Sequence, residues 1–294
     1  MKRRTSRRRK QRFPFLLLRL VCLLTILLCA VGLIAKAAVR QRNEQAQAEM
    51  HTLFYGTQEG SGATIAPLSE AAPELPEETP MAGPWDQTLE PRAAFESLLL
   101  VNPDTKGWLT AGDVIDTAVT QRDNEFYLSH NFFGEEASEG MAFMDAGCCV
   151  LPEDTHFIIH GHNMRNGTVF GNLDNFRSAD YLKAHPVIRY NTLYRDAAYV
   201  PIAIFDISAE PDDPSYMDIQ QFNFDSDQDF AAFVADAKSR SAIDLPFDAQ
   251  PGDRLLSLLT CSYTNRNGRL VVMCREFREG ETEETISAEM AKIG

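Results

Sequence analysis

The N-terminal part of the chain contains one long apolar stretch. Residues 15–35 read FLLLRLVCLLTILLCAVGLIA, and Arg19 is the only charged residue among them. A helix of this length, at about 1.5 Å per residue, can cross the roughly 30 Å hydrocarbon layer of a membrane. We therefore predict a transmembrane signal-anchor at 15–35. The alternative is a cleaved signal peptide, because Ala35-Lys36-Ala37 resembles a small-residue cleavage site.

Beyond residue 92 the apolar residues come in short runs that are typical of β-strands. Residues 108–121 contain two such runs, broken at Gly112-Asp113 as in a hairpin. Further runs, rich in β-branched and aromatic residues, are GMAFMDAGCCV, THFIIHGH, HPVIRYN, AAYVPIAIFDI, DRLLSLLTCSY and RLVVMCREF. Residues 172–185 and 227–240 have helical patterns instead. Many strands with few helices predict a mostly β fold, a closed or nearly closed β-barrel with peripheral helices.

Differences in amino-acid composition divide the rest of the chain into segments. Residues 1–14 form a basic segment. Residues 36–92 begin with a polar, helix-forming stretch at 40–54 and continue as a proline-rich spacer, which cannot build a core. We predict the folded domain at 93–278 and an acidic, frayed or helical tail at 279–294.

The charge is distributed unevenly. The net charge is −14, but residues 1–12 carry eight Lys or Arg and no acidic residue, so the remainder carries −22. An acidic body argues against nucleic acid as a partner, because phosphate binding needs a basic surface. The basic cluster before the apolar segment predicts a cytoplasmic N-terminus, and everything after about residue 40 is then exported.

Four cysteines lie beyond the apolar segment: Cys148, Cys149, Cys261 and Cys274. In an exported protein four cysteines could form two disulfides. Cys148 and Cys149 are adjacent, and adjacent cysteines rarely reach the geometry of a bridge without strain. We therefore expect some of these thiols to be free, and a free exported thiol calls for a chemical reason.

Residues 156–164, HFIIHGHNM, bring three histidines close together. Alternation along a strand would place His156, His160 and His162 on one face, where imidazoles could bind zinc. The zinc hypothesis lacks a further ligand, since neither an HExxH spacing nor a partner carboxylate motif is present. His162 is the better single candidate for chemistry, because Gly161 permits a close backbone approach and Asn163 can orient the ring.

Cys261 ends one strand-like run and Arg269 begins the next. A lone cysteine at a strand end is more often a packed apolar residue than a nucleophile. If Asn267-Gly268 is a two-residue turn, Cys261 lies opposite Cys274 and about 16 Å from the level of Arg269, which favours a disulfide. If residues 262–268 form an open loop, Arg269 lies directly across from Cys261. A thiol beside a guanidinium can be a reactive thiolate.

Three ordered motifs resemble those of the class B sortases. Ser257-Leu-Leu-Thr-Cys261 is similar to the cysteine signature T-L-x-T-C, with Ser in place of the first Thr. Gly161-His162-Asn-Met and Gly268-Arg269-Leu-Val-Val resemble the histidine and arginine motifs. Residues 102–109 and 123–132 also match, so that the resemblance covers roughly residues 95–277.

The resemblance implies a closed eight-stranded sortase-type β-barrel and a cysteine transpeptidase. Cys261 would be the nucleophile, His162 the acid and base, and Arg269 the cationic partner. The substrate-binding residues would be Asn124, Leu128 and Thr260. No metal and no organic cofactor is implied.

The expected partners are an exported protein and an amine. The exported protein would carry a C-terminal sorting signal similar to Asn-Pro-(Gln/Lys)-Thr-(Asn/Gly/Ser), and the amine would belong to a peptidoglycan cross-bridge. The enzyme would be a single-pass protein of the cell membrane, held by its N-terminal helix, with its catalytic domain outside.

The chain departs from the family pattern at three places. Leu259 stands where class B members often carry a hydroxyl residue, and the loop between Cys261 and Arg269 is shorter than in some members. Met273-Cys274 stands where many read V-V-H after the arginine. The alternatives are a pilin-polymerising sortase, a zinc-dependent surface hydrolase that uses the histidines, and a non-catalytic adhesin stabilised by a Cys261–Cys274 bridge.

Overall fold

The computed structural model describes residues 12–56, 89–261 and 267–294. The chain divides into a helical unit up to Ala46 and a compact unit from Gln47 to Gly294. Most of the basic segment at 1–14 and of the predicted spacer therefore lies outside the described residues.

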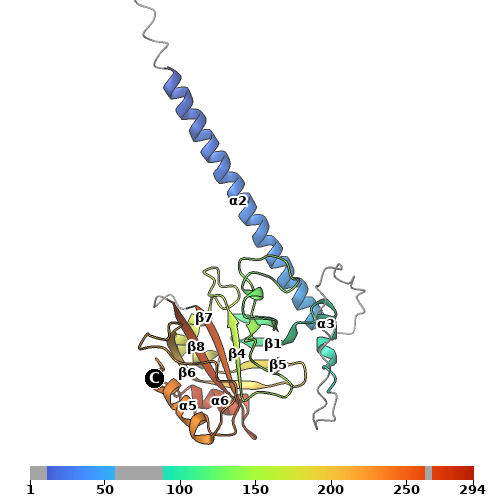
Figure 1. Ribbon diagram of the computed structural model, residues 1–294, viewed down its shortest axis with the longest axis vertical. Helices are drawn as coiled ribbons and strands as arrows, with labels where there is room; N and C mark the ends of the chain where they lie inside the picture. Colours follow the sequence, from blue (N-terminus) through green and yellow to red (C-terminus); the bar gives the residue numbers. More distant parts are fainter. Residues whose placement is uncertain (1–11, 57–88, 262–266) are drawn as a thin grey trace, which may run out of the picture. The chain divides into compact units, whose positions relative to one another are not determined.

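A single long helix, α2 (Arg12–Tyr55), contains the predicted signal-anchor and the polar stretch that follows it (Figure 1). By length and composition this helix can cross a membrane, and a signal sequence near an N-terminus would have the same character. Its large apolar side chains between Leu18 and Val39 are exposed. The helix is thus consistent with a membrane anchor or a signal.

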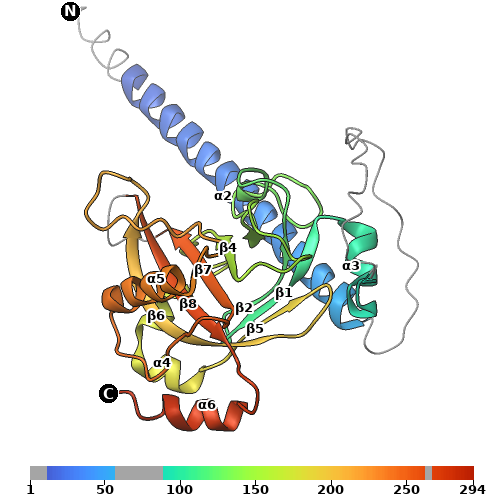
Figure 2. The same cartoon turned by 60° about the horizontal axis from the view of Figure 1, so that its bottom comes forward.

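The compact unit contains a closed eight-stranded barrel with strand order β1-β2-β3-β4-β7-β8-β6-β5 (Figures 1 and 2). This confirms the predicted mostly β fold. The strands are β1 (Thr105–Ala111), β2 (Ile115–Thr120), β3 (Phe143–Met144), β4 (His156–Gly161), β5 (Ile188–Thr192), β6 (Ala198–Ser208), β7 (Leu255–Cys261) and β8 (Gly268–Glu276).

Local sequence explains several of these elements. β1 and β2 form the predicted hairpin, and Gly112 at its turn has φ +59°, a conformation that favours glycine. β6 is buried along nearly its whole length, since it pairs with β5 and β8 and carries helix α5 (Asp227–Arg240) on one side. Ser226 caps α5 by accepting a hydrogen bond from the Asp229 N–H.

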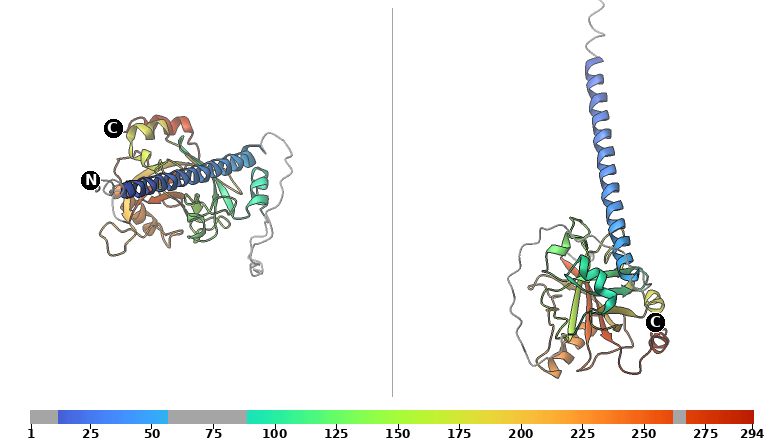
Figure 3. Two further views of the ribbon diagram at one scale, coloured as in Figure 1. Left: turned by 90° about the horizontal axis from the view of Figure 1, so that it is seen from above. Right: turned by 90° about the vertical axis from the view of Figure 1, so that its right-hand side faces the viewer.

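The remaining helical segments are short and surround the barrel. They are η2 (Ala93–Phe95), α3 (Glu96–Val101), η3 (Phe126–Leu128), η4 (Leu173–Arg177), α4 (Ala179–Ala184) and α6 (Glu283–Met290). The acidic tail contains α6, which lies beside α4 (Figures 2 and 3). Ile286 and Met290 of α6 are buried, so this part of the tail belongs to the core.

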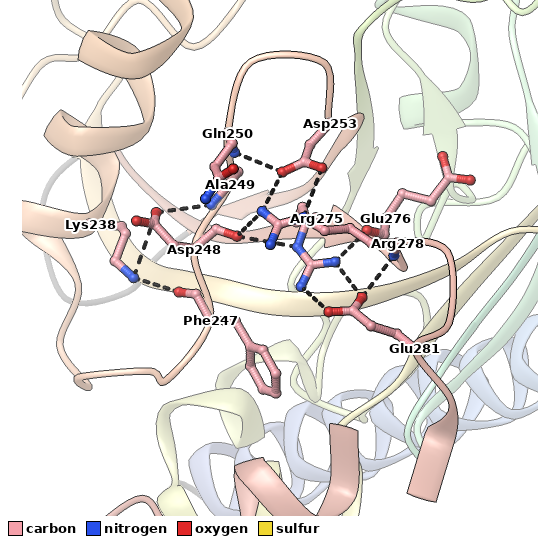
Figure 4. A network of polar contacts seen from close by, with 10 residues as sticks. All are labelled: Lys238, Phe247, Asp248, Ala249, Gln250, Asp253, Arg275, Glu276, Arg278 and Glu281. Carbon is pink, nitrogen blue, oxygen red and sulfur yellow. Dashed lines mark hydrogen bonds and ion pairs between the residues drawn. The ribbon is translucent and has the colours of Figure 1, made fainter. Parts of the chain in front are cut away.

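A polar network connects the end of β8 with the segment that leads into α6 (Figure 4). Arg275 is 1% exposed, and its guanidinium donates to both carboxylate oxygens of Glu281 at 2.5 and 2.9 Å. Arg278 pairs with Asp253 in the same network, at 2.7 Å. The hydrogen bond from Arg275 lowers the pKa of Glu281 and burial raises it. The hydrogen bond has the larger effect, so the pKa lies below its usual value.

The C-terminal end of α2 packs on the barrel as part of the compact unit. Met50 and Phe54 are buried, and the Phe54 ring stacks on Trp108 with centroids 4.1 Å apart. Asp116 on β2 accepts hydrogen bonds from the Trp108 indole at 2.6 Å and the Tyr55 hydroxyl at 2.8 Å. This helix end is therefore held by both apolar and polar contacts.

Candidate active site

A groove of about 410 Å³ lies where β4, β7 and β8 approach the loops that follow β2 and β6. It brings together five residues that the sequence analysis selected from distant segments. They are Asn124, Leu128, His162, Thr260 and Arg269. The barrel topology explains this convergence, because β4, β7 and β8 are neighbours in the sheet although about 100 residues separate β4 from β7 in the chain.

The parallel pairing of β4 with β7 places two of the candidate residues at the same end of the barrel. Gly161 is the register partner of Thr260, and both strands end at this level. His162 and Cys261 are the next residues of their segments. Gly161 is required here for space, since a Cβ atom at this position would lie 2.6 Å from Cγ of Phe170.

The antiparallel pairing of β7 with β8 aligns Cys261 with Arg269. Cys274 is instead aligned with Leu256, so the two-residue hairpin that would oppose Cys261 to Cys274 is wrong. The register agrees with the open-loop alternative, although residues 262–266 of that loop lie outside the described residues.

Two of the other cysteines are buried free thiols. Burial raises the pKa of Cys148 to about 12, and it raises the pKa of Cys274 well above the usual range of a thiol. Both therefore remain protonated and unreactive at neutral pH. Their positions in the core are explained by packing, without a chemical role.

His162 lies just beyond β4 and is half-buried. Its Nε2 atom is 2.8 Å from the backbone carbonyl of Leu128, which is an acceptor, so Nε2 carries the proton in this contact. The expected partner Asn163 is buried and donates to Asp174 at 3.3 Å. The Leu128 carbonyl thus orients the imidazole, a contact that the sequence analysis did not anticipate.

Arg269 opens β8 at the groove and is half-buried. Its Nη1 atom donates to the carbonyl of Gly268 at 3.1 Å. No carboxylate within residues 12–56, 89–261 and 267–294 forms an ion pair with it. Its positive charge is therefore not neutralised by a described carboxylate, and it can interact with an anionic or partly anionic group in the groove.

The residues predicted to bind substrate line the same groove but differ in exposure. Leu128 is 39% exposed, which makes it an accessible apolar contact. Asn124 uses its Oδ1 atom to accept from the Ala146 N–H at 2.8 Å. Thr260 is 2% exposed, and its hydroxyl has no hydrogen-bond partner in the described part of the chain.

The three histidines of residues 156–162 have different hydrogen-bond partners. His156 is fully buried between the Gln221 carbonyl and the Ser257 hydroxyl, each at 2.8 Å. His160 contacts the Asp145 carboxylate at 2.9 Å. Within the residues that the structure describes, no group of three or more His, Cys, Asp or Glu side chains is placed to hold a metal ion.

Asp145 and Gln220, which were not predicted from the sequence, also line the groove. Gln220 donates to the Asp145 carboxylate at 2.8 Å across 75 residues of sequence. No periodicity or motif connects them, so only the folded arrangement reveals this contact.

Comparisons with known proteins agree with this fold. The sortase domain family matches residues 118–277. Sortase B of Listeria monocytogenes is 30% identical over 187 residues, covering 62% of this chain and 74% of that protein. Sortase B of Staphylococcus aureus is 26% identical over 188 residues, covering 63% and 75%.

A solved structure of Clostridium perfringens sortase B is similar with a TM-score of 0.57 and 28% identity, over 62% of this chain and 99% of that one. The range that the sortase domain matches runs from within β2 to just after β8 and includes the segments that carry His162, Cys261 and Arg269. The chain therefore belongs to the sortase family and is a cysteine transpeptidase of the sortase B type.

Proposed function

We propose that this transpeptidase cleaves a C-terminal sorting signal similar to Asn-Pro-(Gln/Lys)-Thr-(Asn/Gly/Ser) in an exported protein. It then transfers the new acyl group to an amine of a peptidoglycan cross-bridge. The observation that carries this proposal is the alignment of Cys261 with Arg269 at the end of the groove where His162 follows Gly161.

The chemistry proceeds in two acyl-transfer steps. The Cys261 thiolate attacks the threonine carbonyl carbon, and the resulting tetrahedral intermediate collapses to a thioacyl enzyme with loss of the downstream amine. His162, as the imidazolium that accompanies the thiolate, gives a proton to that leaving amine. The acceptor amine then attacks the thioacyl carbon, His162 takes its proton, and the Cys261 thiolate leaves.

Arg269 stabilises negative charge during both steps. The carbonyl oxygen of the threonine becomes an oxyanion in each tetrahedral intermediate. A fixed guanidinium without a carboxylate partner among the described residues can neutralise this charge without reorganisation. Removing one such donor typically costs about 10²–10³ in rate.

We propose the cell membrane as the site of action. The N-terminal apolar helix would anchor the chain, and the eight basic residues before it would remain in the cytoplasm. The catalytic domain, proposed at 93–278, would then face the cell wall, which contains the acceptor amine.

Single substitutions at the proposed catalytic residues test this function in the full-length chain. With a fluorogenic sorting peptide in detergent, we expect Cys261→Ala and His162→Ala to abolish cleavage. Arg269→Ala should lower kcat about 10²–10³-fold. His160→Ala should keep most of kcat, and His185→Ala, at a residue that does not line the groove, serves as the matched histidine control. Full activity of Cys261→Ala would contradict the mechanism.

A further inference from the structure

A second imidazole, that of His160, lies in the wall of the proposed substrate groove. His160 is the register partner of Leu259 on β7, and both residues line the groove. The side chain of His160 is 22% exposed, and its ring stacks on Phe143 with centroids 5.2 Å apart. The ring is thus fixed in orientation and accessible from the groove.

A buried carboxylate fixes His160 from behind. The Asp145 side chain is 2% exposed, and its Oδ2 atom receives hydrogen bonds from His160 Nε2 at 2.9 Å and Gln220 at 2.8 Å. Its Oδ1 atom accepts from the Gly147 N–H at 2.9 Å. Burial alone would raise the pKa of Asp145, but the hydrogen bonds, that of His160 foremost, hold it well below its usual value.

This arrangement determines which nitrogen of His160 carries the proton. An ionised carboxylate can only accept, so Nε2 must be the donor in its contact with Asp145. In the neutral ring Nδ1 is then an acceptor. Among the residues that the structure describes, Nδ1 of His160 has no hydrogen-bond partner. His160 lines the groove, so Nδ1 of the neutral ring is an acceptor atom on a rigid ring of the groove wall.

We propose that His160 is a specificity-determining residue, whose Nδ1 atom accepts a hydrogen bond from a carboxamide or ammonium side chain of the bound peptide. This inference rests on the proposed function, because the ligand is the sorting peptide. A carboxylate of the same size cannot donate to Nδ1, and it would also approach the ionised Asp145. The site should therefore prefer Asn, Gln or Lys over Asp or Glu.

Isosteric peptides test this preference with the full-length chain in detergent. The peptides contain Asn-Pro-Gln-Thr-Asn, Asn-Pro-Glu-Thr-Asn or Asp-Pro-Gln-Thr-Asn, and kcat and KM are measured for each. The proteins are the wild type, His160→Ala, His160→Gln and the control His185→Ala. His185 is a suitable control because it is 29% exposed, lies beside the carboxylate of Asp113 and does not line the groove.

We expect the wild type to prefer the amide peptide over the acid peptide at one of the two positions. His160→Ala should reduce that preference about 3- to 10-fold, the effect of one hydrogen bond, mainly through KM and with kcat retained. His160→Gln should restore it, because a carboxamide can donate to Asp145 and still offer an acceptor oxygen. His185→Ala should leave the preference unchanged.

An unchanged amide-to-acid ratio in folded His160→Ala would overturn the inference, as would an equal fall in kcat for all three peptides. The fold is checked by thermal unfolding. If the alanine variant does not fold, His160→Met fills similar space without a nitrogen, and an unchanged ratio in that variant has the same meaning. If the wild type cleaves none of the peptides, the proposed function itself fails. If the wild type cleaves them but the amide-to-acid ratio is unchanged in the variant, only the inference about His160 fails.

Discussion

His156 lies in the same strand as His160, yet it has no access to the groove. Its ring is fully buried, with its two nitrogens hydrogen-bonded to Gln221 and Ser257. Burial lowers the pKa of His156 from its usual 6.5 to about 4, because the charged form would lose its hydration. His156 is therefore a neutral structural residue at physiological pH.

The stability of the fold should consequently decrease in mild acid. As the pH falls below about 6.5, the unfolded chain takes up a proton at His156, whereas the folded chain does so only near 4. The free energy of unfolding should fall by about 3 kcal/mol between pH 6.5 and pH 4, because each pKa unit of difference between the two states corresponds to about 1.36 kcal/mol. Urea unfolding between pH 7 and pH 4 measures it.

The matched variant is His156→Gln, which keeps hydrogen-bonding groups and cannot titrate. We expect this variant to be less stable at pH 7, with a smaller decrease in unfolding free energy between pH 6.5 and pH 4. The same decrease in both proteins would show that His156 does not cause it.

At the level of single residues, sequence reasoning was most successful where backbone geometry restricts the choice. Gly161 has no room for a side chain, as expected from a close backbone approach, and the structure brings His162 and Arg269 into one groove. The partner of Cys261 could not be decided from spacing, because one register opposes it to Arg269 and the other to Cys274. Local sequence does not determine that register.

At the level of elements, the end of α2 packs into the core of the compact unit, and this packing was not predicted from the sequence. The sequence indicates a polar helix at 40–54, but its apolar residues Met50 and Phe54 are four positions apart and face Trp108 and Phe95. An i, i+4 apolar pair in an otherwise polar helix was the available signal. These last turns contribute to the core of the compact unit.

Removing this helix end should destabilise the barrel. A chain that begins at Gln47 keeps Met50 and Phe54, whereas one that begins at Thr57 loses both. Burial of these two side chains contributes about 3–6 kcal/mol, so the shorter chain should unfold at lower temperature and lower urea concentration.

Point variants of the full chain provide the control for this comparison. Phe54→Ala should lower the free energy of unfolding by about 3–5 kcal/mol, whereas Glu49→Ala, on the exposed side of the same helix, should change it little. Equal unfolding free energies for Phe54→Ala and the wild type would show that the helix end is not part of the cooperative unit.

Strand existence was easier to predict than strand neighbours. Each apolar run became a strand near its expected position, although β3 is only Phe143–Met144 because the rest of its run turns away at Asp145 to Cys148. The parallel partnership of β4 with β7 joins segments about 100 residues apart, so it follows from barrel closure and from no local pattern.

For the molecule as a whole, the family resemblance supplied what periodicity could not, namely the closure of eight strands and the convergence of three motifs at one end. Neither the resemblance nor the periodicity predicted the individual contacts between side chains. The Asp145 network is the main example, since its members come from β4 and from the loops after β3 and β6.

The two ends of the proline-rich segment are both attached to the compact unit. Phe54 is buried just before it, and just after it Arg92 donates to the Leu193 carbonyl at 2.8 Å and pairs with Asp196 at 2.6 Å. Residues 57–88, which lie outside the described residues, therefore connect two points of the compact unit. If α2 is the anchor, only residues 36–46 connect the membrane-spanning part to the domain.

If α2 anchors the enzyme, its distance from the membrane should therefore not depend on the length of the segment 57–88. Doubling residues 57–88 should cost only about 0.6 kcal/mol in loop closure and leave sorting on the cell surface intact. Inserting the same number of glycine and serine residues after Ala46 should instead alter sorting, as measured by the surface-linked fraction of a reporter. A loss of sorting from the loop insertion alone, with the domain still folded, would show that the loop sets the reach of the enzyme toward the cell wall.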